Sequence, residues 1–167
     1  MNASPKSIKV LMVCLGNICR SPTAQGIFEK YVEESHLKQH IEVDSAGTGN
    51  WHIGESPDIR SLKAAARRGY DISGQRARQI MPDDYTHFDY ILAMDIMNLK
   101  ELERDCPPRF RQNLRLFMTF GDFDYNSVPD PYHSGPDGFE LVLDLVEEAS
   151  QNLLDYIIKL HDLRSDQ

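Results

Sequence analysis

The feature that most constrains the fold is a short apolar run followed by a tight loop and a helix start. Residues 8–13 (IKVLMV) are typical of a buried strand. From residue 23 onward the pattern is helical, and Cys14 and Arg20 bracket the loop between the two. Such an order is typical of an α/β protein. The predicted helix has apolar side chains on one face, namely Ala24, Ile27, Phe28, Tyr31 and Val32.

Further short apolar runs alternate with helical patterns along the chain. This alternation predicts an α/β fold with a four-stranded parallel sheet and helices on both faces, in a Rossmann-like three-layer arrangement. With 167 residues, we expect a single domain over 1–167, with its core at about 8–160. The strands are predicted at about 8–13, 41–45, 90–94 and 114–118.

Helix ends are predicted from capping and stop residues. Ser21 is expected to cap the first helix, with Pro22 at its first position. A helix at about 57–68 is expected to stop at Gly69, and another through residue 103 before Pro107 and Pro108. A long loop is predicted at 121–136. After it, a capping box of Asp137 and Glu140 is expected to open the last helix. The core-facing stripe predicted for this helix is Phe139, Val142, Leu143, Val146, Leu153, Ile157 and Leu160.

Composition excludes several functional classes. The formal net charge is −8, which disfavours general binding to nucleic acid or to acidic membranes. Apolar runs are too short to span a bilayer, and Lys9 interrupts the only run that resembles a signal peptide. Three cysteines form no even disulfide framework, so we expect a cytoplasmic protein with reduced thiols. The histidines are scattered, so we expect no metal and no cofactor.

The loop between Cys14 and Arg20 is predicted to bind an oxyanion. Backbone N–H groups at a helix start lack intrahelical partners, and the helix dipole favours negative charge there. The same field favours the thiolate form of Cys14, a nucleophile, and Arg20 can pair with two phosphate oxygens at once. In an open parallel sheet, ligands bind at the carboxyl ends of the strands, where Cys14 is placed. The N–H groups expected to complete the cup belong to Leu15, Gly16, Asn17, Ile18, Cys19 and Arg20.

The filled motif C-x5-R-S-P over residues 14–22 resembles the low-molecular-weight protein tyrosine phosphatase family. Two later segments, residues 44–48 (DSAGT) and 130–132 (DPY), are similar to the same family, and the resemblance extends from about residue 8 to 160. It implies the phosphotyrosine phosphatase I-like fold and a metal-independent hydrolysis of phosphotyrosine in proteins. Cys14 is then expected to attack phosphorus and form a phosphocysteine, while Arg20 binds the phosphate.

Residues outside the loop acquire roles through the same resemblance. Asp130 is expected to protonate the leaving oxygen and then to act as base toward water, which predicts a bell-shaped pH–rate profile. Trp51 and Tyr132 are expected to flank the substrate ring, with Ile18 as an apolar side wall. The residues expected to hold the loop and favour the thiolate are Asn17, Ser21 and Ser45.

The sequence departs from the family pattern at two places. His133 follows Tyr132 where many members have a second aromatic residue, and Gln75 stands where many have a histidine that joins the loop network. Cys19 is the second thiol of the loop, and the resemblance implies that it can form a reversible disulfide with Cys14. A packed, redox-inert Cys19 is the alternative.

Two other functions share some of these features. An arsenate reductase of the same fold needs further cysteines to relay a disulfide, and only Cys106 lies outside the loop. A non-catalytic phosphopeptide-binding module is the other alternative, although it has no need of Cys14 or Asp130. The expected partners are a tyrosine-phosphorylated protein as substrate and inorganic phosphate or another oxyanion in the loop, and we expect a monomer or weak dimer.

Overall fold

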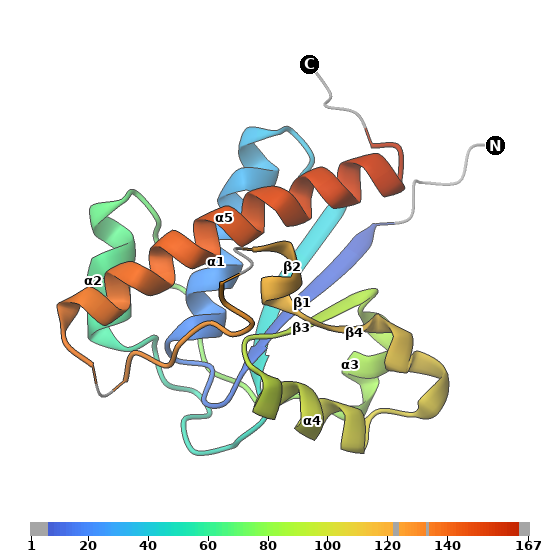
Figure 1. Ribbon diagram of the computed structural model, residues 1–167, viewed down its shortest axis with the longest axis horizontal. Coiled ribbons are helices and arrows are strands. Elements are labelled where there is room, and N and C mark those ends of the chain that lie inside the picture. The colour runs from blue at the N-terminus through green and yellow to red at the C-terminus, as the bar shows by residue number, and fades with distance from the viewer. Residues whose placement is uncertain (1–6, 122–123, 133, 164–167) are drawn as a thin grey trace.

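A four-stranded sheet runs through the centre of the molecule (Figure 1). The computed structural model describes residues 7–121, 124–132 and 134–163. All strand pairs are parallel, and their order is β2-β1-β3-β4, which places β1 inside the sheet. Parallel strands end at one edge of a sheet, so the loops that follow β1, β2 and β3 share one side of the molecule. The strands are β1 (Ile8–Cys14), β2 (Ile41–Gly47), β3 (Tyr90–Ala93) and β4 (Leu114–Leu116).

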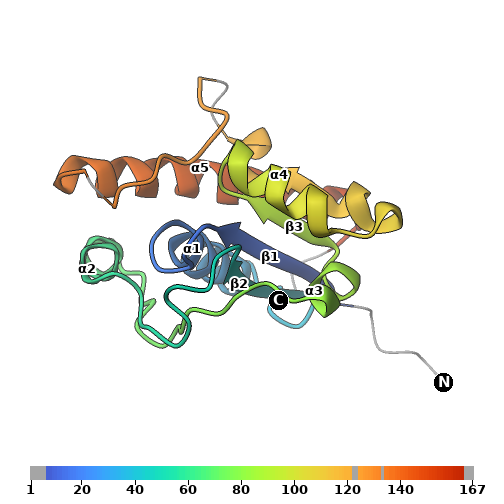
Figure 2. The ribbon, with the colours of Figure 1, turned by 90° about the horizontal axis from the view of Figure 1, so that it is seen from below.

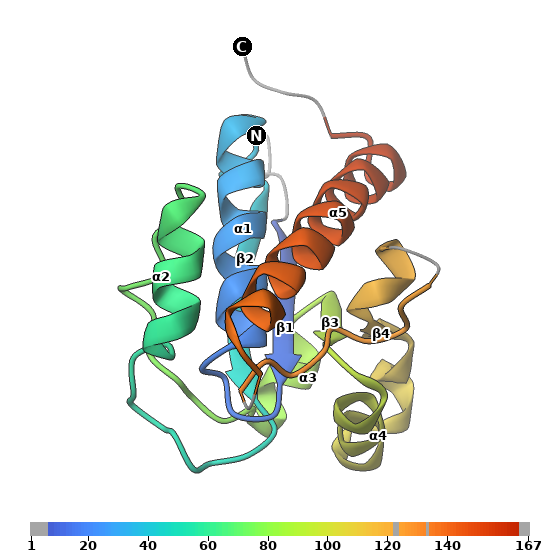
Figure 3. The ribbon, with the colours of Figure 1, turned by 60° about the vertical axis from the view of Figure 1, so that its left-hand side comes forward.

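Helices cover both faces of this sheet. Alternate residues of β1 point to opposite faces: Met12 belongs to a core with α1, α2 and α5, whereas Val13 belongs to a core with α3 and α4. Figures 2 and 3 accordingly show α2 and α4 on opposite sides of the strands. The helices are α1 (Arg20–Glu34), α2 (Ile59–Arg67), α3 (Pro82–His87), α4 (Ile96–Asp105) and α5 (Pro136–Leu160), with 3-10 helices at Pro108–Asn113 and Phe117–Phe120.

The structure confirms the predicted fold class and the four strands. Only the last strand is clearly too long in the prediction, because the chain turns into a 3-10 helix at Phe117 instead of continuing to residue 118. There the Thr119 hydroxyl donates to the carbonyl of Leu116, at 2.7 Å. Phe117 is fully buried, so its apolar character indicated burial correctly but not strand geometry. The sequence analysis missed α3 and the 3-10 helix at Pro108–Asn113.

Three predictions about the helices were wrong. Ser21 is not the cap of α1: this helix begins at Arg20, after Cys19, and has no side-chain cap. Asp137 does not open α5 through a capping box, because that helix begins at Pro136 after Gly135. Glu140 pairs instead with Arg67, the last residue of α2, and with Arg68, which follows it. Leu160 is 58% exposed and lies outside the core stripe, at the end of α5.

In the part of the chain that the structure describes, none of the helices is both long and apolar enough to cross a membrane.

Candidate active site

The loop after β1 is held against the end of β2. The N–H groups of Thr48 and Gly49 donate to the carbonyls of Cys14 and Leu15, each at 2.9 Å. A Cβ atom on Gly47 would lie 2.8 Å from the Leu15 carbonyl oxygen, so only glycine allows this approach. β2 therefore ends in glycine, the fourth residue of the DSAGT segment, because the loop lies on it.

The sulfur of Cys14 is buried and faces two hydrogen-bonding groups. Its Sγ atom is 3.0 Å from Ser21 Oγ and accepts the N–H of Asn17 at 3.3 Å. Asn17 has a φ of 57°, in the left-handed region where asparagine is tolerated better than most residues. This backbone conformation turns the N–H of Asn17 back toward the sulfur.

The direction of donation in the network beneath the loop follows from its chemistry. Ser45 Oγ has one proton and contacts the Gln25 carbonyl oxygen Oε1 at 2.6 Å, so Ser45 donates to Gln25. The amide Nδ2 of Asn17 then donates to Ser45 Oγ at 3.0 Å and to Ser21 Oγ at 2.8 Å. Ser21 Oγ therefore accepts from Asn17, and its own proton is directed at Cys14 Sγ. A hydroxyl that donates to sulfur stabilises the thiolate form.

Arg20 is buried at the first position of α1, with its guanidinium fixed by oxygen atoms. Nη1 donates to Asp95 Oδ2 at 2.7 Å and to the carbonyl of Val128 at 3.1 Å, while Nη2 is 3.9 Å from Asp130 Oδ2. Burial lowers the pKa of Arg20, but Cys14, Asp95 and Asp130 outweigh burial and raise the pKa above its ordinary value. Arg20 therefore keeps its positive charge although it is buried.

A cavity of about 260 Å³ opens above the loop. It brings together Cys14, Arg20 and Asp130, which are far apart in the sequence. Asp130 Oδ1 accepts the N–H of Tyr132 at 3.0 Å, while its Oδ2 faces Arg20. The other lining residues are Leu15, Gly16, Ile18, Cys19, Trp51, His52 and Tyr132.

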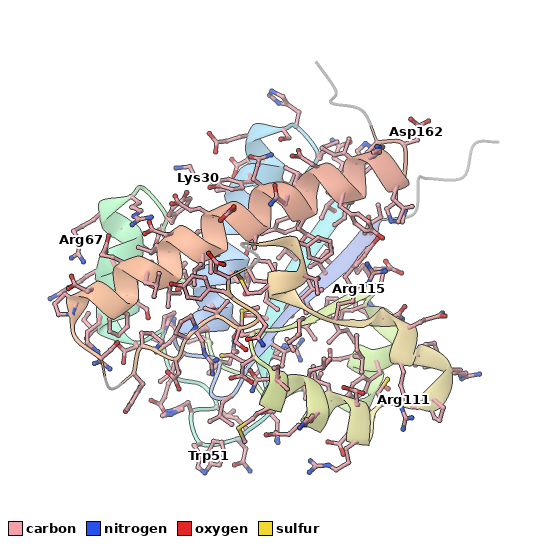
Figure 4. The ribbon with its side chains drawn as sticks, in the orientation of Figure 1. Lys30, Trp51, Arg67, Arg111, Arg115 and Asp162 are labelled. Carbon is pink, nitrogen blue, oxygen red and sulfur yellow. The ribbon has the colours of Figure 1, made fainter. Side chains whose placement is uncertain are left out.

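Two aromatic side chains stand at the mouth of this cavity. Trp51 is 67% exposed and Tyr132 is 40% exposed. Figure 4 shows Trp51 on the loop after β2, at the outer edge of the molecule. Ile18 is buried and lines the same cavity. The predicted apolar and aromatic wall residues therefore share one cavity with the predicted nucleophile. His133, where the sequence departs from the family, lies outside the described residues.

Cys19 lines the same cavity but is held as a thiol. Burial is the largest effect and raises the pKa of Cys19 to about 12, even though a hydrogen bond with Ser61 acts in the opposite direction. All three cysteines are free. The redox role that the resemblance implies for Cys19 stays a prediction.

The sequence analysis missed three residues of the site. Asp95 orients Arg20, and His52 lines the cavity while its Nδ1 lies 2.9 Å from Glu55 Oε2. Gln25 ends the hydrogen-bond chain on the first turns of α1. A position just after β3, at the carboxyl end of a parallel strand, was the available signal for Asp95. His52 and Gln25 carried no signal, because polar residues are common in loops and on helix surfaces.

Gln75 lies where its position in the sequence suggested, at the edge of the network. Its Oε1 is 3.5 Å from Ser45 Oγ, and its Nε2 donates to the carbonyl of Pro22 at 2.9 Å.

Within residues 7–121, 124–132 and 134–163, no group of three or more histidine, cysteine and acidic residues is arranged to hold a metal ion.

Comparison with known proteins places this geometry among phosphatases. Residues 9–165 match the family described as low molecular weight phosphotyrosine protein phosphatase. The low molecular weight protein-tyrosine-phosphatase of Streptomyces coelicolor is 42% identical over 153 residues, which cover 87% of this chain and 91% of the relative. The low molecular weight phosphotyrosine protein phosphatase of Schizosaccharomyces pombe is 41% identical over 152 residues, covering 89% and 96%.

Solved structures give the same result. A protein tyrosine phosphatase from Entamoeba histolytica, crystallised with Hepes in its active site, superposes with a TM-score of 0.89 at 39% identity, over 94% of this chain and 100% of that chain. YfkJ from Bacillus subtilis also has a TM-score of 0.89, at 37% identity, over 95% and 99% of the two chains.

Proposed function

The chain belongs to the family of low molecular weight phosphotyrosine protein phosphatases and is a protein tyrosine phosphatase, and we propose that it acts through a phosphocysteine on Cys14. The observation that carries this proposal is the shared cavity, in which the Cys14 sulfur, the Arg20 guanidinium and the Asp130 carboxyl meet. The proposed substrates are tyrosine-phosphorylated proteins and small aryl phosphates.

In the first step, the Cys14 thiolate attacks phosphorus in line with the leaving phenolic oxygen. The S–P bond forms as the P–O bond breaks, and Asp130 gives its proton to the departing oxygen. Arg20 and the loop N–H groups bind the other phosphate oxygens, on which negative charge is concentrated. The contacts of Arg20 with Asp95 and Val128 support this role, because they hold the guanidinium in place before substrate arrives.

In the second step, water attacks the phosphocysteine. The Asp130 carboxylate takes a proton from that water, the S–P bond breaks, and inorganic phosphate and the thiolate are formed. The hydroxyl of Ser21 favours the thiolate as leaving group, since it donates to Cys14 Sγ. Asn17 and Ser45 support this step by fixing the direction in which Ser21 donates.

Preference for an aryl substrate is proposed to come from the cavity mouth. Trp51 and Tyr132 offer exposed aromatic surface, and Ile18 offers an apolar side wall, so a phenyl ring can stack where a charged side chain would lose its hydration.

A relay of thiols, as arsenate reduction requires, finds no support in the position of Cys106. That residue is buried at the end of α4, in the core on the other face of the sheet from Cys14.

The test is hydrolysis of an aryl phosphate, with a chelator present throughout. We expect turnover by the parent protein, none by Cys14→Ser, and a rate reduced about 10²–10⁴-fold in Asp130→Ala, the usual contribution of a general acid. We also expect a bell-shaped pH–rate profile in the parent, whose alkaline limb is lost in Asp130→Asn. Absence of turnover by reduced, folded parent protein would refute the proposal.

A further inference from the structure

A second cavity, of about 350 Å³, lies beside the candidate active site and is lined by basic side chains. Arg60, Lys63 and Arg67 follow one another along a single face of α2, at a spacing of three and four residues. The opposite wall consists of Ser134 and Gly135, just before α5, and of Pro136 and Phe139 at the start of that helix. We call this cavity the basic groove. Figure 4 shows Arg67 on α2, beside the start of α5.

The basic groove adjoins the catalytic cavity through one arginine. The Arg60 guanidinium lies over the ring of Tyr132, 5.3 Å from its centroid, and over the ring of Phe139, at 4.8 Å. Tyr132 lines the catalytic cavity, whereas Phe139 lines the basic groove. A chain that enters the catalytic cavity can therefore continue into the basic groove within a few residues, since each extended residue spans about 3.3–3.6 Å.

The charge of the basic groove contrasts with that of the whole chain, which is −8. Some of its charge is already paired: Arg60 Nη2 lies 3.0 Å from Asp58 Oδ2, and Arg67 Nη2 lies 3.5 Å from Glu140 Oε2. Neither carboxylate lines the groove. Lys63 has no ion-pair partner among the described residues, so its charge faces the groove uncompensated. The Arg67 pair is exposed on both sides and contributes little to stability, so it can exchange for a new partner. Arg60, by contrast, is bound to Asp58 by two side-chain hydrogen bonds.

We propose that the basic groove binds acidic side chains of the substrate polypeptide that flank the phosphotyrosine. This inference rests on the proposed function, since the phosphotyrosine itself must occupy the catalytic cavity. It gives the enzyme a preferred class of substrate: phosphotyrosine sites within a few residues of aspartate or glutamate. Lys63 is the principal contact, Arg67 the second, and Arg60 connects the two cavities.

The test compares two phosphotyrosine peptides that differ only in their flanking residues, acidic in one and neutral in the other, with a small aryl phosphate as reference. We expect the parent protein to favour the acidic peptide in kcat/KM by about fivefold at low salt, which corresponds to the upper end of one exposed ion pair. The preference should decrease as salt is added. Lys63→Glu and Arg67→Glu should each abolish it, while hydrolysis of the aryl phosphate stays at the parental rate.

Lys100→Glu is the matched control, because it makes the same change of charge on an exposed position of α4. It should keep the parental preference. Equal use of the two peptides by the parent, or an unchanged preference in both groove variants, would overturn the inference. If the parent fails to hydrolyse the aryl phosphate, the proposed function fails instead. The groove is then tested by direct binding of the same two peptides, where tighter binding of the acidic peptide must depend on Lys63.

Discussion

At the scale of single residues, one neutral amide determines the direction of the hydrogen bonds beneath the loop. The amide of Asn17 accepts the N–H of Arg78 on its Oδ1 at 3.0 Å, so its Nδ2 faces Ser21 and Ser45 and donates to both. Ser45 in turn donates to the Gln25 carbonyl oxygen. All of these groups are uncharged and do not titrate near neutral pH.

Gln25→Ala is expected to lower kcat/KM for an aryl phosphate about fivefold, since a neutral hydrogen bond contributes about 1 kcal/mol. Without the Gln25 acceptor, Ser45 is held less firmly beneath Asn17 Nδ2, so the Asn17 amide that orients Ser21 is less fixed and the donation to Cys14 weakens. The acid limb of the pH–rate profile should also move to higher pH, because the thiolate is less stabilised. A merely structural role for Gln25 does not move that limb.

Gln75→Ala is the matched control, because Gln75 also presents its Oε1 to Ser45, but at 3.5 Å. It should shift the acid limb less than Gln25→Ala does. A parental profile in Gln25→Ala would contradict the assignment.

Sequence reasoning identified the residues whose chemistry is unusual for their position. Cys14 and Arg20, at the two ends of the loop before a helix, and Asp130, in a long loop, all line one cavity in the structure. It missed Asp95 and Gln25, because their importance depends on the atoms they face. Nothing in a sequence shows that a glutamine on α1 will meet a serine of β2 at 2.6 Å.

At the scale of elements, the start of α2 connects the candidate site to the rest of the fold. The Asp58 side chain caps this helix by accepting the N–H of Arg60 at 2.8 Å. The N–H of Asp58 itself donates to the carbonyl of Ile18, in the loop after β1, also at 2.8 Å. A side-chain hydrogen bond with Arg60 is the largest effect on Asp58 and lowers its pKa.

Asp58→Ala is expected to reduce the free energy of unfolding by about 0.5–2 kcal/mol, the usual value of a helix cap. Because the pKa of Asp58 is lower in the folded state, the charge-dependent part of its contribution is complete above the unfolded value, about 3.9, and is lost as pH falls through the folded pKa. Urea unfolding at pH 7 and below pH 3 checks both statements: the difference between Asp58→Ala and the parent should shrink in acid.

Asp58→Asn separates the cap from the ion pair. Asparagine caps as well as aspartate but lacks the charge that pairs with Arg60, so at pH 7 this variant should lose only the charge-dependent part of the stability that Asp58→Ala loses. A large loss in Asp58→Asn would show that the charge, and not the cap, stabilises α2.

Elements with a strong apolar period were predictable, whereas their ends were less so. The glycine stop after α2 was predicted from its residue type, and Gly69 has the expected positive φ of 87°. The start of α1 was not, because Ser21 resembles a cap but its hydroxyl is used by Cys14. A capping residue that has a second partner in the folded protein cannot be recognised from its spacing alone.

At the scale of the whole molecule, the sheet assembles the candidate site from distant parts of the chain. The ends of β1 and β2, the residue after β3 and the segment before α5 all meet at one edge, and Val128 and Asp130 contact Arg20 from more than a hundred residues away. The general place of the site followed from the rule for parallel sheets. The part played by residues 124–132 did not follow from that rule: Asp130 and Tyr132 were expected there through the family resemblance, and the contact of Val128 with Arg20 was not expected.

An anion in the loop should therefore stabilise the entire fold. Inorganic phosphate bound to the native state alone at 100 times its Kd adds about 2.7 kcal/mol. For a domain of this size, 1 kcal/mol raises Tm by about 2–4 °C, so a rise of about 5–11 °C is expected in the parent.

Arg20→Ala should lose this rise, and Arg20→Lys should keep only part of it, because lysine keeps the charge without the planar pair of donors. Arg111→Ala, on the outer surface shown in Figure 4, should keep the full rise. Differential scanning fluorimetry across a phosphate titration measures all four proteins, and an undiminished rise in Arg20→Ala would mean that phosphate binds elsewhere.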